Sequence, residues 1–407
     1  MNQTPQSLLA ARRAAFPIGA SVTVDALTRD PYAVYEALRE AEPISWLSAL
    51  EMWYVTRHED VQRVLLDTAR FTTVFERSPI HETFGEQVLT SEGLAHGRYR
   101  RALQGEFAKF RVQSLAEKLR ILAERLVESV AADGTAEIRR VFASRLPIQA
   151  MLEMCGLPLV MESQVRRWYD HFEAALANFR GDELLRQNAG RSIDEFYRFL
   201  QDEIDTLPVT GEPCLLRTLV STAGAGRLTD DEVKRNLGIV FFGGISTVEA
   251  LILNCLWALS RHPELGIAAK GNPGLIAAIV DETIRWHSPV QSATRHTRCA
   301  VKMGVAHILE GEIVNCMLGA ANRDPRIFSN PECFMLHRPN IRQHLAFAAG
   351  PHACLGFHLA KLEAQIALEV LLEKLPEFRV VATVSEAPSG YEFHQPRRLQ
   401  ASWSVAT

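Results

Sequence analysis

The chain has 407 residues, of which 47% are hydrophobic and 23% charged, and its formal net charge is −4. This composition is ordinary for a soluble globular protein, and it gives no reason to expect nucleic-acid binding because no run of Lys and Arg resembles a DNA-binding arm. The seven cysteines are scattered without a C-x-x-C pair, which is typical of a reducing compartment. The first residues also lack the ordered regions of a signal peptide. We therefore expect a cytoplasmic protein.

The N-terminal part predicts two helices with a strand pair between them. Apolar residues recur at helical spacing from residue 31 to 42 and again from 58 to 66. Residues 44–47 and 52–56 are rich in β-formers and are separated by a short turn. Residues 72–91 are polar with little repeat, so we expect a long functional or mobile loop there.

Residues 92–109 predict a helix with a basic face. His96 and Arg100 lie one turn apart and therefore share a side of it. From this segment alone, a solvated basic face is the favoured interpretation. Beyond it, residues 113–206 are mostly helical by pattern, and residues 208–226 contain several glycines and prolines that predict a surface connection.

A long helix is predicted from Thr229 onward. Thr229 and Glu232 form a capping box, in which each side chain accepts from the other residue's backbone. Apolar residues then follow at steps of three and four for about 30 residues, which corresponds to roughly 45 Å of helix. The apolar run from residue 237 to 259 nearly reaches membrane-spanning length, but polar residues and glycines interrupt it. We expect a buried helix of a soluble protein.

Two adjacent glycines in the middle of this helix need an explanation. Gly243 and Gly244 each cost a helix interior roughly 1 kcal/mol relative to alanine. One interpretation is a helix crossing with close backbones. The other is a flat cofactor lying against the glycines while Thr247 offers its hydroxyl group to a ligand, with the local backbone hydrogen bonds opened.

The last third begins with a predicted ion pair. Glu282 and Arg285 lie one turn apart on a helix, where such a pair contributes roughly a few tenths of a kcal/mol. The chain leaves this helix at Pro289 and enters an extended run that contains Arg295. Near the C-terminus, Gly390 indicates a turn between two strands.

Residues 345–363, with the sequence LAFAAGPHACLGFHLAKLE, are the most informative segment. Gly350 and the proline after it prevent regular structure before Cys354, and apolar residues at helical spacing follow the cysteine. Cys354 is therefore predicted at a helix N-terminus, where backbone N–H groups and the helix dipole favour a thiolate and a metal ligand. Gly350 and Gly356 leave room for close approach by a large flat cofactor.

Two other interpretations of the cysteine stay open on these residues alone. A lone cysteine is most often a small buried hydrophobic residue. Cys354 and His358 lie one turn apart and, with His344 and His352, could also form a zinc site. Against zinc, no second cysteine follows at the spacing typical of structural sites.

The segment from Phe347 to Gly356 closely resembles the haem-binding signature of the cytochrome P450 family, including the alanine and glutamate that follow it. The resemblance implies that the Cys354 thiolate is the axial ligand of haem b, and thiolate ligation in these enzymes favours O–O cleavage. One departure is Ala348, which stands where the family often has glycine. We expect this change to alter the detail of the loop and not the ligation.

The resemblance extends over four motifs in the family's order, from about residue 30 to residue 400. It implies a mainly α fold with a smaller β region, built as a single domain over residues 1–407, with the haem buried between the long central helix and the cysteine loop. It also implies that histidine and arginine side chains hold the haem propionates through charge-assisted hydrogen bonds. The implied cofactor-binding residues are His96, Arg100, Gly243, Gly244, Arg295, Phe347, Gly350, His352, Cys354 and Gly356.

The middle of the long helix resembles the family's oxygen-activating motif with one exception. Its two glycines and Thr247 match, whereas Ser246 stands in the position of the acid. In the family, the threonine is thought to support dioxygen activation and the acid to help deliver protons. We predict that Thr247 supports O–O cleavage with help from Ser246. Glu249, three residues further on, is a candidate substitute for the acid, as are water and a substrate group.

The predicted ion pair resembles part of the family's structural ion triad. The residues from Ala321 to Pro325, and the aromatic and proline positions after them, occur in the order that the family shows. This order implies that Arg338 joins Glu282 and Arg285. We interpret all three residues as determinants of the fold and not as catalysts.

Three residues are predicted to border the substrate space. They are Val290 and Gln291, which follow the helix end, and Phe393, which follows Gly390. Phenylalanines in weakly patterned segments also indicate an apolar substrate, although some of them belong to the core: Phe75, Phe84, Phe172 and Phe179.

The sequence thus predicts a haem-thiolate monooxygenase that oxidises a small to medium, largely apolar organic substrate with dioxygen and two electrons. No fused flavin or iron–sulfur segment is visible, so a separate ferredoxin and ferredoxin reductase are the expected electron donors, with no nucleic-acid or membrane partner. Because Ser246 replaces the acid, coupling, desaturation or dealkylation is the alternative outcome. From other classes, a zinc-site protein and a haem-based gas-binding protein remain as alternatives.

Overall fold

The computed structural model describes residues 5–75, 78–176, 182–208, 210–221 and 226–405. They divide into two compact units, neither of which is a continuous segment of chain. The first unit comprises residues 1–72, 253–354 and 380–399, and the second comprises residues 73–252, 355–379 and 400–407. The single domain predicted over residues 1–407 stays a prediction.

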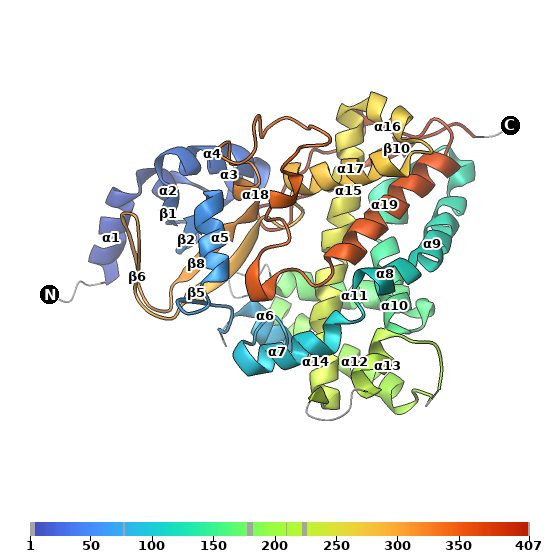
Figure 1. The fold of residues 1–407 in the computed structure, drawn as a ribbon, viewed down its shortest axis with the longest axis horizontal. Coiled ribbons are helices and arrows are strands. Elements are labelled where there is room, and N and C mark those ends of the chain that lie inside the picture. Colours follow the sequence, from blue (N-terminus) through green and yellow to red (C-terminus); the bar gives the residue numbers. More distant parts are fainter. Residues whose placement is uncertain (1–4, 76–77, 177–181, 209, 222–225, 406–407) are drawn as a thin grey trace. The chain divides into compact units, whose positions relative to one another are not determined.

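The first unit combines short helices with most of the β structure (Figure 1). Its elements are α1 (Pro5–Ala15), α2 (Pro17–Ser21), α3 (Val24–Arg29), α4 (Pro31–Ala41), β1 (Ile44–Leu47), β2 (Met52–Val55), α5 (His58–Leu66), β3 (Phe71–Thr72), α16 (Pro263–Ala269), α17 (Pro273–Trp286), β5 (Ser292–Thr297), β6 (Val301–Met303), β7 (Ala306–Ile308), β8 (Ile313–Met317) and α18 (Leu318–Ala321).

Five strands of this unit form one sheet in the order β1-β2-β8-β5-β3. β1 and β2 are the predicted antiparallel hairpin, β2 runs parallel to β8, and β5 runs antiparallel to both β8 and β3. Alternate side chains of a strand point to opposite faces of the sheet. Trp46 and Trp53 therefore join one buried cluster with α5, whereas Leu47 and Tyr54 join another with α3 and α4.

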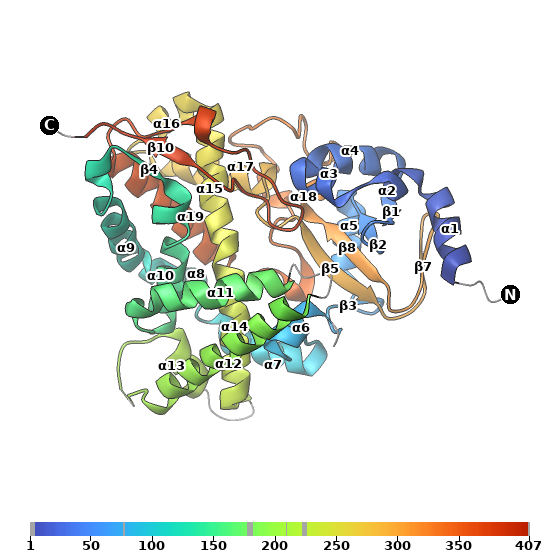
Figure 2. The same cartoon turned by 180° about the vertical axis from the view of Figure 1, so that it is seen from behind.

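The second unit is almost entirely helical (Figure 2). Its elements are α6 (Pro79–Phe84), α7 (Gly93–Gln104), α8 (Lys109–Ser114), α9 (Ala116–Glu128), β4 (Thr135–Glu137), α10 (Leu146–Cys155), α11 (Glu162–Leu176), α12 (Glu183–Asp205), α13 (Leu215–Ser221), α14 (Asp230–Gly244), α19 (Phe357–Lys374) and β10 (Gln400–Ser402), while α15 (Ser246–Arg261) and β9 (Arg379–Val380) lie where the chain passes between the units.

Long helices of the second unit pack in pairs. α19 lies against α9, where Arg120 donates to Glu369 at 3.1 Å and also pairs with Glu373. α11 lies against α12, where the indole of Trp168 donates to Glu195 at 2.9 Å. The contact with α12 helps to fix the position of α11, which carries side chains of the candidate site.

The long helix begins as predicted. The Thr229 hydroxyl accepts from the backbone N–H of Glu232 at 3.2 Å, and the Glu232 carboxylate accepts from the backbone N–H of Thr229 at 2.9 Å. The helix is divided into α14 and α15 at Ile245, whose φ of −100° and ψ of −78° leave the ideal helical values.

In the described part of the chain, one helical stretch, Asp230–Arg261, is long and apolar enough to cross a membrane by length and composition. In its most apolar window, 78% is buried inside the protein, and core helices of other proteins meet the same criteria.

Short elements account for the differences from the sequence prediction. Residues 72–91 contain α6, and residues 208–226 contain α13, although both segments were predicted to lack regular structure. β4 interrupts a region predicted to be helical and pairs with β10 from the C-terminal end. Because this pairing joins residues about 265 positions apart, local periodicity could not reveal it.

Candidate functional site

The cysteine loop of the first unit is closed by a backbone hydrogen bond. The N–H of Cys354 donates to the carbonyl of Phe347 at 2.8 Å. Helix α19 has Gly356 as its N-cap, so Cys354 lies two residues before the cap and not in the first turn. The predicted effect of the helix dipole on the thiol is correspondingly weaker, since that effect falls off within one turn.

Gly350 is required for the packing of this loop against the end of α5. Its φ is +76°, and an added Cβ would lie 2.8 Å from the carbonyl oxygen of Leu65. A side chain at this position would therefore face both a strained backbone and a steric clash. The loop can pass Leu65 at this distance only with glycine.

Ala348 has the backbone conformation that glycine normally supplies. Its φ is +56°, in the left-handed region. This is the position at which the resembled family often has glycine, so the departure noted in the sequence leaves the loop conformation intact at a cost in backbone energy. The cost is about 1 kcal/mol.

We expect Ala348→Gly to raise the free energy of unfolding by about 0.5–1 kcal/mol, because it relieves the left-handed strain. Ala349→Gly is the matched control: residue 349 has a φ of −149°, so glycine there relieves nothing and should be neutral or destabilising. Denaturant titration of both variants checks this. Equal shifts of the same sign would contradict the assignment of strain to Ala348.

The surface around the thiol fits a flat cofactor. The Cys354 side chain is exposed, and Phe347, Ala348 and Ala349 beside it are only half-buried. Cysteine is usually among the most buried residue types, so an exposed thiol among apolar residues favours a ligand-binding role.

In the second unit, a side chain is inserted into the hydrogen-bond ladder of the long helix. The hydroxyl of Tyr169, on α11, accepts from the backbone N–H of Ser246 at 3.3 Å and donates to the carbonyl of Phe242 at 3.5 Å. In an unbroken helix these two backbone groups would bond to each other. The Thr247 hydroxyl donates to the carbonyl of Gly243 at 2.7 Å. The opening of local hydrogen bonds predicted for this segment is therefore confirmed.

The two glycines at this opening are explained by different features of their surroundings. An added Cβ on Gly244 would lie 2.6 Å from Sδ of Met151 on α10, so Gly244 serves a close helix crossing. Gly243 is exposed, and an added Cβ would meet nothing within 4 Å. The smooth surface at Gly243 is what a flat ligand needs, with the half-buried Thr247 one turn further along.

Ser246, which stands in the acid position, has a carboxyl partner from another helix. Its hydroxyl donates to Oε1 of Glu173 on α11 at 3.0 Å. Burial raises the pKa of Glu173, and the charge of Glu249 raises it further, while the hydrogen bond from Ser246 and the charge of Arg139 lower it.

Glu249 is engaged elsewhere. It is 1% exposed, and its carboxylate accepts from Arg139 at 2.6 Å and from Arg166 at 3.4 Å. Two guanidinium groups occupy its oxygens, so these contacts favour a structural ion pair over the predicted substitution for the missing acid.

Several residues implied in propionate binding are largely shielded from solvent. His96 on α7 is 8% exposed, and burial, followed by the charge of Arg100, lowers the pKa of His96. In the first unit, Arg295 on β5 is 5% exposed and donates to the carbonyl of Thr294 at 2.8 Å. His352 lies in the turn before the cysteine and is half-buried. A carboxylate ligand would raise the pKa of His96 and favour its charged form.

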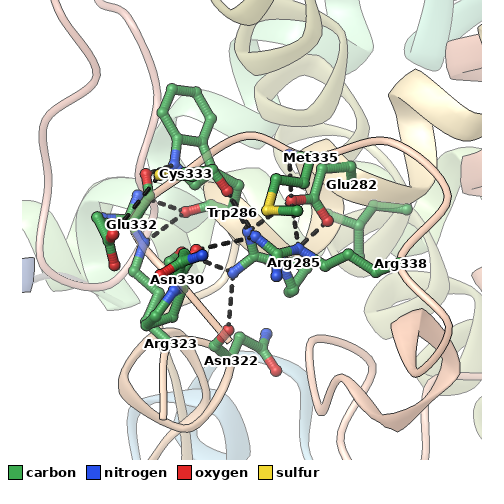
Figure 3. A network of polar contacts seen from close by, with 12 residues as sticks. Glu282, Arg285, Trp286, Asn322, Arg323, Asn330, Glu332, Cys333, Met335 and Arg338 are labelled. Carbon is green, nitrogen blue, oxygen red and sulfur yellow. Dashed lines mark hydrogen bonds and ion pairs between the residues drawn. The ribbon is translucent and has the colours of Figure 1, made fainter. Parts of the chain in front are cut away.

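The predicted ion triad is assembled in the interior of the first unit (Figure 3). Arg285 pairs with Glu282 at 2.6 Å, and Arg338 pairs with Glu282 at 2.9 Å. Arg285 also donates to the backbone carbonyls of Asn322, at 3.1 Å, and Cys333, at 3.0 Å. Both arginines therefore hold in place the irregular segment between α18 and the cysteine loop. The sequence pattern did not reveal this role.

The predicted substrate-bordering residues differ in accessibility. Val290 and Phe393 form an isolated β-bridge and are half-buried. Gln291 is fully buried and donates to the carbonyl of Ser288 at 2.6 Å and to the hydroxyl of Tyr32 at 3.4 Å. Gln291 therefore positions the chain and is not accessible to a substrate in this structure.

The other phenylalanines that the sequence offered as pocket residues divide in the same way. Phe84 and Phe172 are core residues whose rings meet edge to face at 5.3 Å. Phe75 is half-buried, and Phe179 lies outside the described residues.

Sequence reasoning missed Tyr169 and Glu173. They contact Ser246 across 77 and 73 residues of chain, and no motif marks them. The zinc alternative gains no support, since in the described ranges no group of three or more His, Cys, Asp or Glu side chains is arranged to hold a metal ion.

Comparison with known proteins adds independent information. The family model for cytochrome P450 matches residues 274–388. The chain is 30% identical to cytochrome P450 107B1 of Saccharopolyspora erythraea, over 88% of this chain and 91% of the relative. It is 32% identical to the mycinamicin IV hydroxylase/epoxidase of Micromonospora griseorubida, over 91% and 94% of the two chains.

Solved structures agree with the fold. A cytochrome P450 from Chondromyces apiculatus matches with a TM-score of 0.83 at 28% identity, covering 96% of this chain and 98% of that one. P450BioI, solved in complex with acyl carrier protein ligated to hexadec-9Z-enoic acid, matches with a TM-score of 0.83 at 27% identity, covering 94% and 100%.

Proposed function

The chain belongs to the cytochrome P450 family, and from this membership we propose that it is a monooxygenase that oxidises a small to medium, largely apolar organic molecule. Enzymes of this family are oxidoreductases that bind haem b through a cysteine thiolate. When bound, the haem supplies the activation of dioxygen, and the protein supplies the ligand, the shape of the pocket and control of protons.

The observation that carries the proposal is the exposed thiol of Cys354 at the end of an apolar loop that matches the haem signature. The thiolate of Cys354 would bind the haem iron, and Phe347, Gly350 and Gly356 would surround it. Gly243 and Gly244 would border the cofactor from the long helix. The propionate carboxylates would be held by His96, Arg100, Arg295 and His352.

The proposed substrate space is bordered by Val290 and Phe393, whose half-buried side chains present apolar surface. A largely apolar substrate matches these side chains, because apolar pockets gain affinity by removing apolar area from water. Gln291 was predicted to border the same space as Val290 and Phe393. Because it is buried, it would instead hold the backbone of this border in place.

Two electrons must come from a redox partner, as in the family generally. We propose a separate ferredoxin and ferredoxin reductase, and a cytoplasmic location. The high buried fraction of the long apolar helix supports a role in the core of the protein and not in a membrane.

The test is turnover of a substrate that changes the spin state of the haem, with a ferredoxin, its reductase and NADPH under labelled dioxygen. One labelled oxygen atom in the product is the expected result. Product that forms without label would favour coupling or desaturation, which is the alternative outcome. Equal turnover with NADPH and no added protein would contradict the proposed partner.

Thr247 is the proposed catalytic hydroxyl. Thr247→Ala should lower the ratio of product to NADPH consumed by about tenfold, because general acid assistance contributes 10²–10⁴-fold and water replaces part of it. Thr247→Ser keeps the hydroxyl and is the matched control. The ratio of product to NADPH for all three proteins decides: an alanine variant with parental coupling would remove Thr247 from the mechanism.

A further inference from the structure

α11 holds the broken turn of the long helix through two side chains one turn apart. Tyr169 bonds to the backbone of Ser246, and Glu173 bonds to its hydroxyl. Residues at positions i and i+4 of a helix lie on the same face, so this face of α11 is directed at Ser246. Ser246 itself is 2% exposed, which leaves its hydroxyl few other partners.

This arrangement puts a carboxyl group next to the residue that lacks one. We propose that Glu173 replaces the missing acid of the long helix: it holds a proton and passes it through the Ser246 hydroxyl toward Thr247. The inference rests on the proposed monooxygenase function. Glu173 acts through Ser246 and is therefore a positioning and proton-holding residue.

The proton balance of the step is simple. In the structure the Ser246 hydroxyl donates to Glu173, and in the step it must turn and accept instead. The O–H bond of the protonated Glu173 carboxyl then breaks as its proton moves to Oγ of Ser246. Oγ of Ser246 releases its own hydroxyl proton to a water molecule that would enter the opened turn on the side of Thr247. The Glu173 carboxylate then takes a proton from bulk water, to which its half-buried side chain has access. No electron moves, and one proton is carried from solvent to the helix break.

The charges around Glu173 suit this role. Burial and the negative charges of Glu249 and Asp170 raise its pKa, while the Ser246 hydrogen bond and the positive charge of Arg139 lower it. On balance the pKa of Glu173 is raised. A carboxyl group whose pKa lies nearer to neutral pH can both keep its proton and release it readily. The protonated fraction of Glu173 falls as pH rises. Coupling that depends on this proton should therefore also fall as pH rises.

The first measurement does not depend on turnover. Infrared difference spectra of the purified protein, recorded across a pH titration, should contain the C=O band of a protonated carboxyl group. Burial also raises the pKa of Glu363 and Glu392, so further bands of this kind are expected in every variant. The band of Glu173 is the one that should be lost in Glu173→Gln and kept in Asp170→Asn. Asp170 lies on the same helix, and its side chain is 58% exposed. Titration curves that are identical in all three proteins would overturn the proposal.

The second measurement is coupling in the reconstituted system. Glu173→Gln should lower product per NADPH by about tenfold and abolish its decline with rising pH. Asp170→Asn should keep the coupling and move its decline only slightly toward lower pH, because Asp170 is the last of the charges that raise the pKa of Glu173. The double variant Glu173→Gln/Ser246→Asp, which returns a carboxyl to the helix, should recover most of the loss. Parental coupling in Glu173→Gln, or no recovery in the double variant, would overturn the proposal.

Two controls keep the outcome clear. If Glu173→Gln does not fold, Ser246→Ala replaces it as the test, because it removes the hydroxyl group on the same proton route. Ser246→Ala should show the same loss of coupling and of pH dependence. Parental coupling and pH dependence in Ser246→Ala would overturn the proposal. Failure of the monooxygenase function is distinguishable, because the parent would then form no labelled product with the redox partner, while the infrared titration would still report the proton on Glu173.

Discussion

Cys354→Ser should abolish thiolate ligation and lower monooxygenase turnover by about 100-fold or more while leaving the fold in place. Serine cannot supply the sulfur donor that promotes O–O cleavage, and the alcohol is a far weaker ligand at neutral pH. The fold should survive because the side chain is exposed, and exposed substitutions usually change stability by no more than about 0.5 kcal/mol. Absorption spectra, haem content and turnover of the variant measure the effect.

The matched control for this substitution is Cys299→Ser, which changes another exposed cysteine in the same unit. It should keep the parental spectrum and turnover. A Cys354→Ser protein that keeps both would show that the ligand is a different residue, and the roles assigned to the loop around it would fail with it.

Glu282→Gln should cause the largest loss of stability, about 3–5 kcal/mol, because it leaves two buried guanidinium groups without their carboxylate. Arg285 has no exposed surface and Arg338 is 5% exposed, so water cannot replace the lost partner. Arg285 holds backbone carbonyls of the irregular segment that leads to the cysteine loop. Loss of haem should therefore accompany unfolding. Denaturant titration monitored by circular dichroism and by haem absorption measures both.

An exposed ion pair provides the control for this variant. Glu59 pairs with Arg63 at 2.9 Å, and their side chains are 83% and 50% exposed. Glu59→Gln should cost between 0 and about 1 kcal/mol, since solvent screens the pair. Similar losses in the two variants would mean that the triad contributes no more than a surface pair.

The sequence predicted those parts of the fold that depend on neighbouring residues. The helix at residues 31–41, the β1–β2 hairpin and the Thr229 capping box follow from spacings of two to four residues, which local patterns contain. The opening of local hydrogen bonds predicted beside the glycine pair is confirmed. Of the two interpretations offered for the pair, the close helix crossing applies to Gly244, and the cofactor at Gly243 stays a prediction.

What the sequence could not provide depends on contacts between distant segments. Glu249 meets Arg139 across 110 residues, and Glu173 meets Ser246 across 73, so no spacing marked either contact. The strain at Ala348 is also invisible in a pattern, because a positive φ is set by how the loop closes on Cys354. The carboxyl partner of Ser246 could therefore be identified only once α11 was placed.

Sulfur ligation of a haem by Cys354 is the assignment on which most of the other proposed roles depend. The most direct measurement is the difference spectrum of the reduced protein with and without carbon monoxide, recorded together with the haem content per chain. We expect close to one haem per chain and the red-shifted absorption of a thiolate-ligated carbon monoxide complex. A purified chain without porphyrin, or a spectrum of histidine-ligated haem, would contradict this assignment.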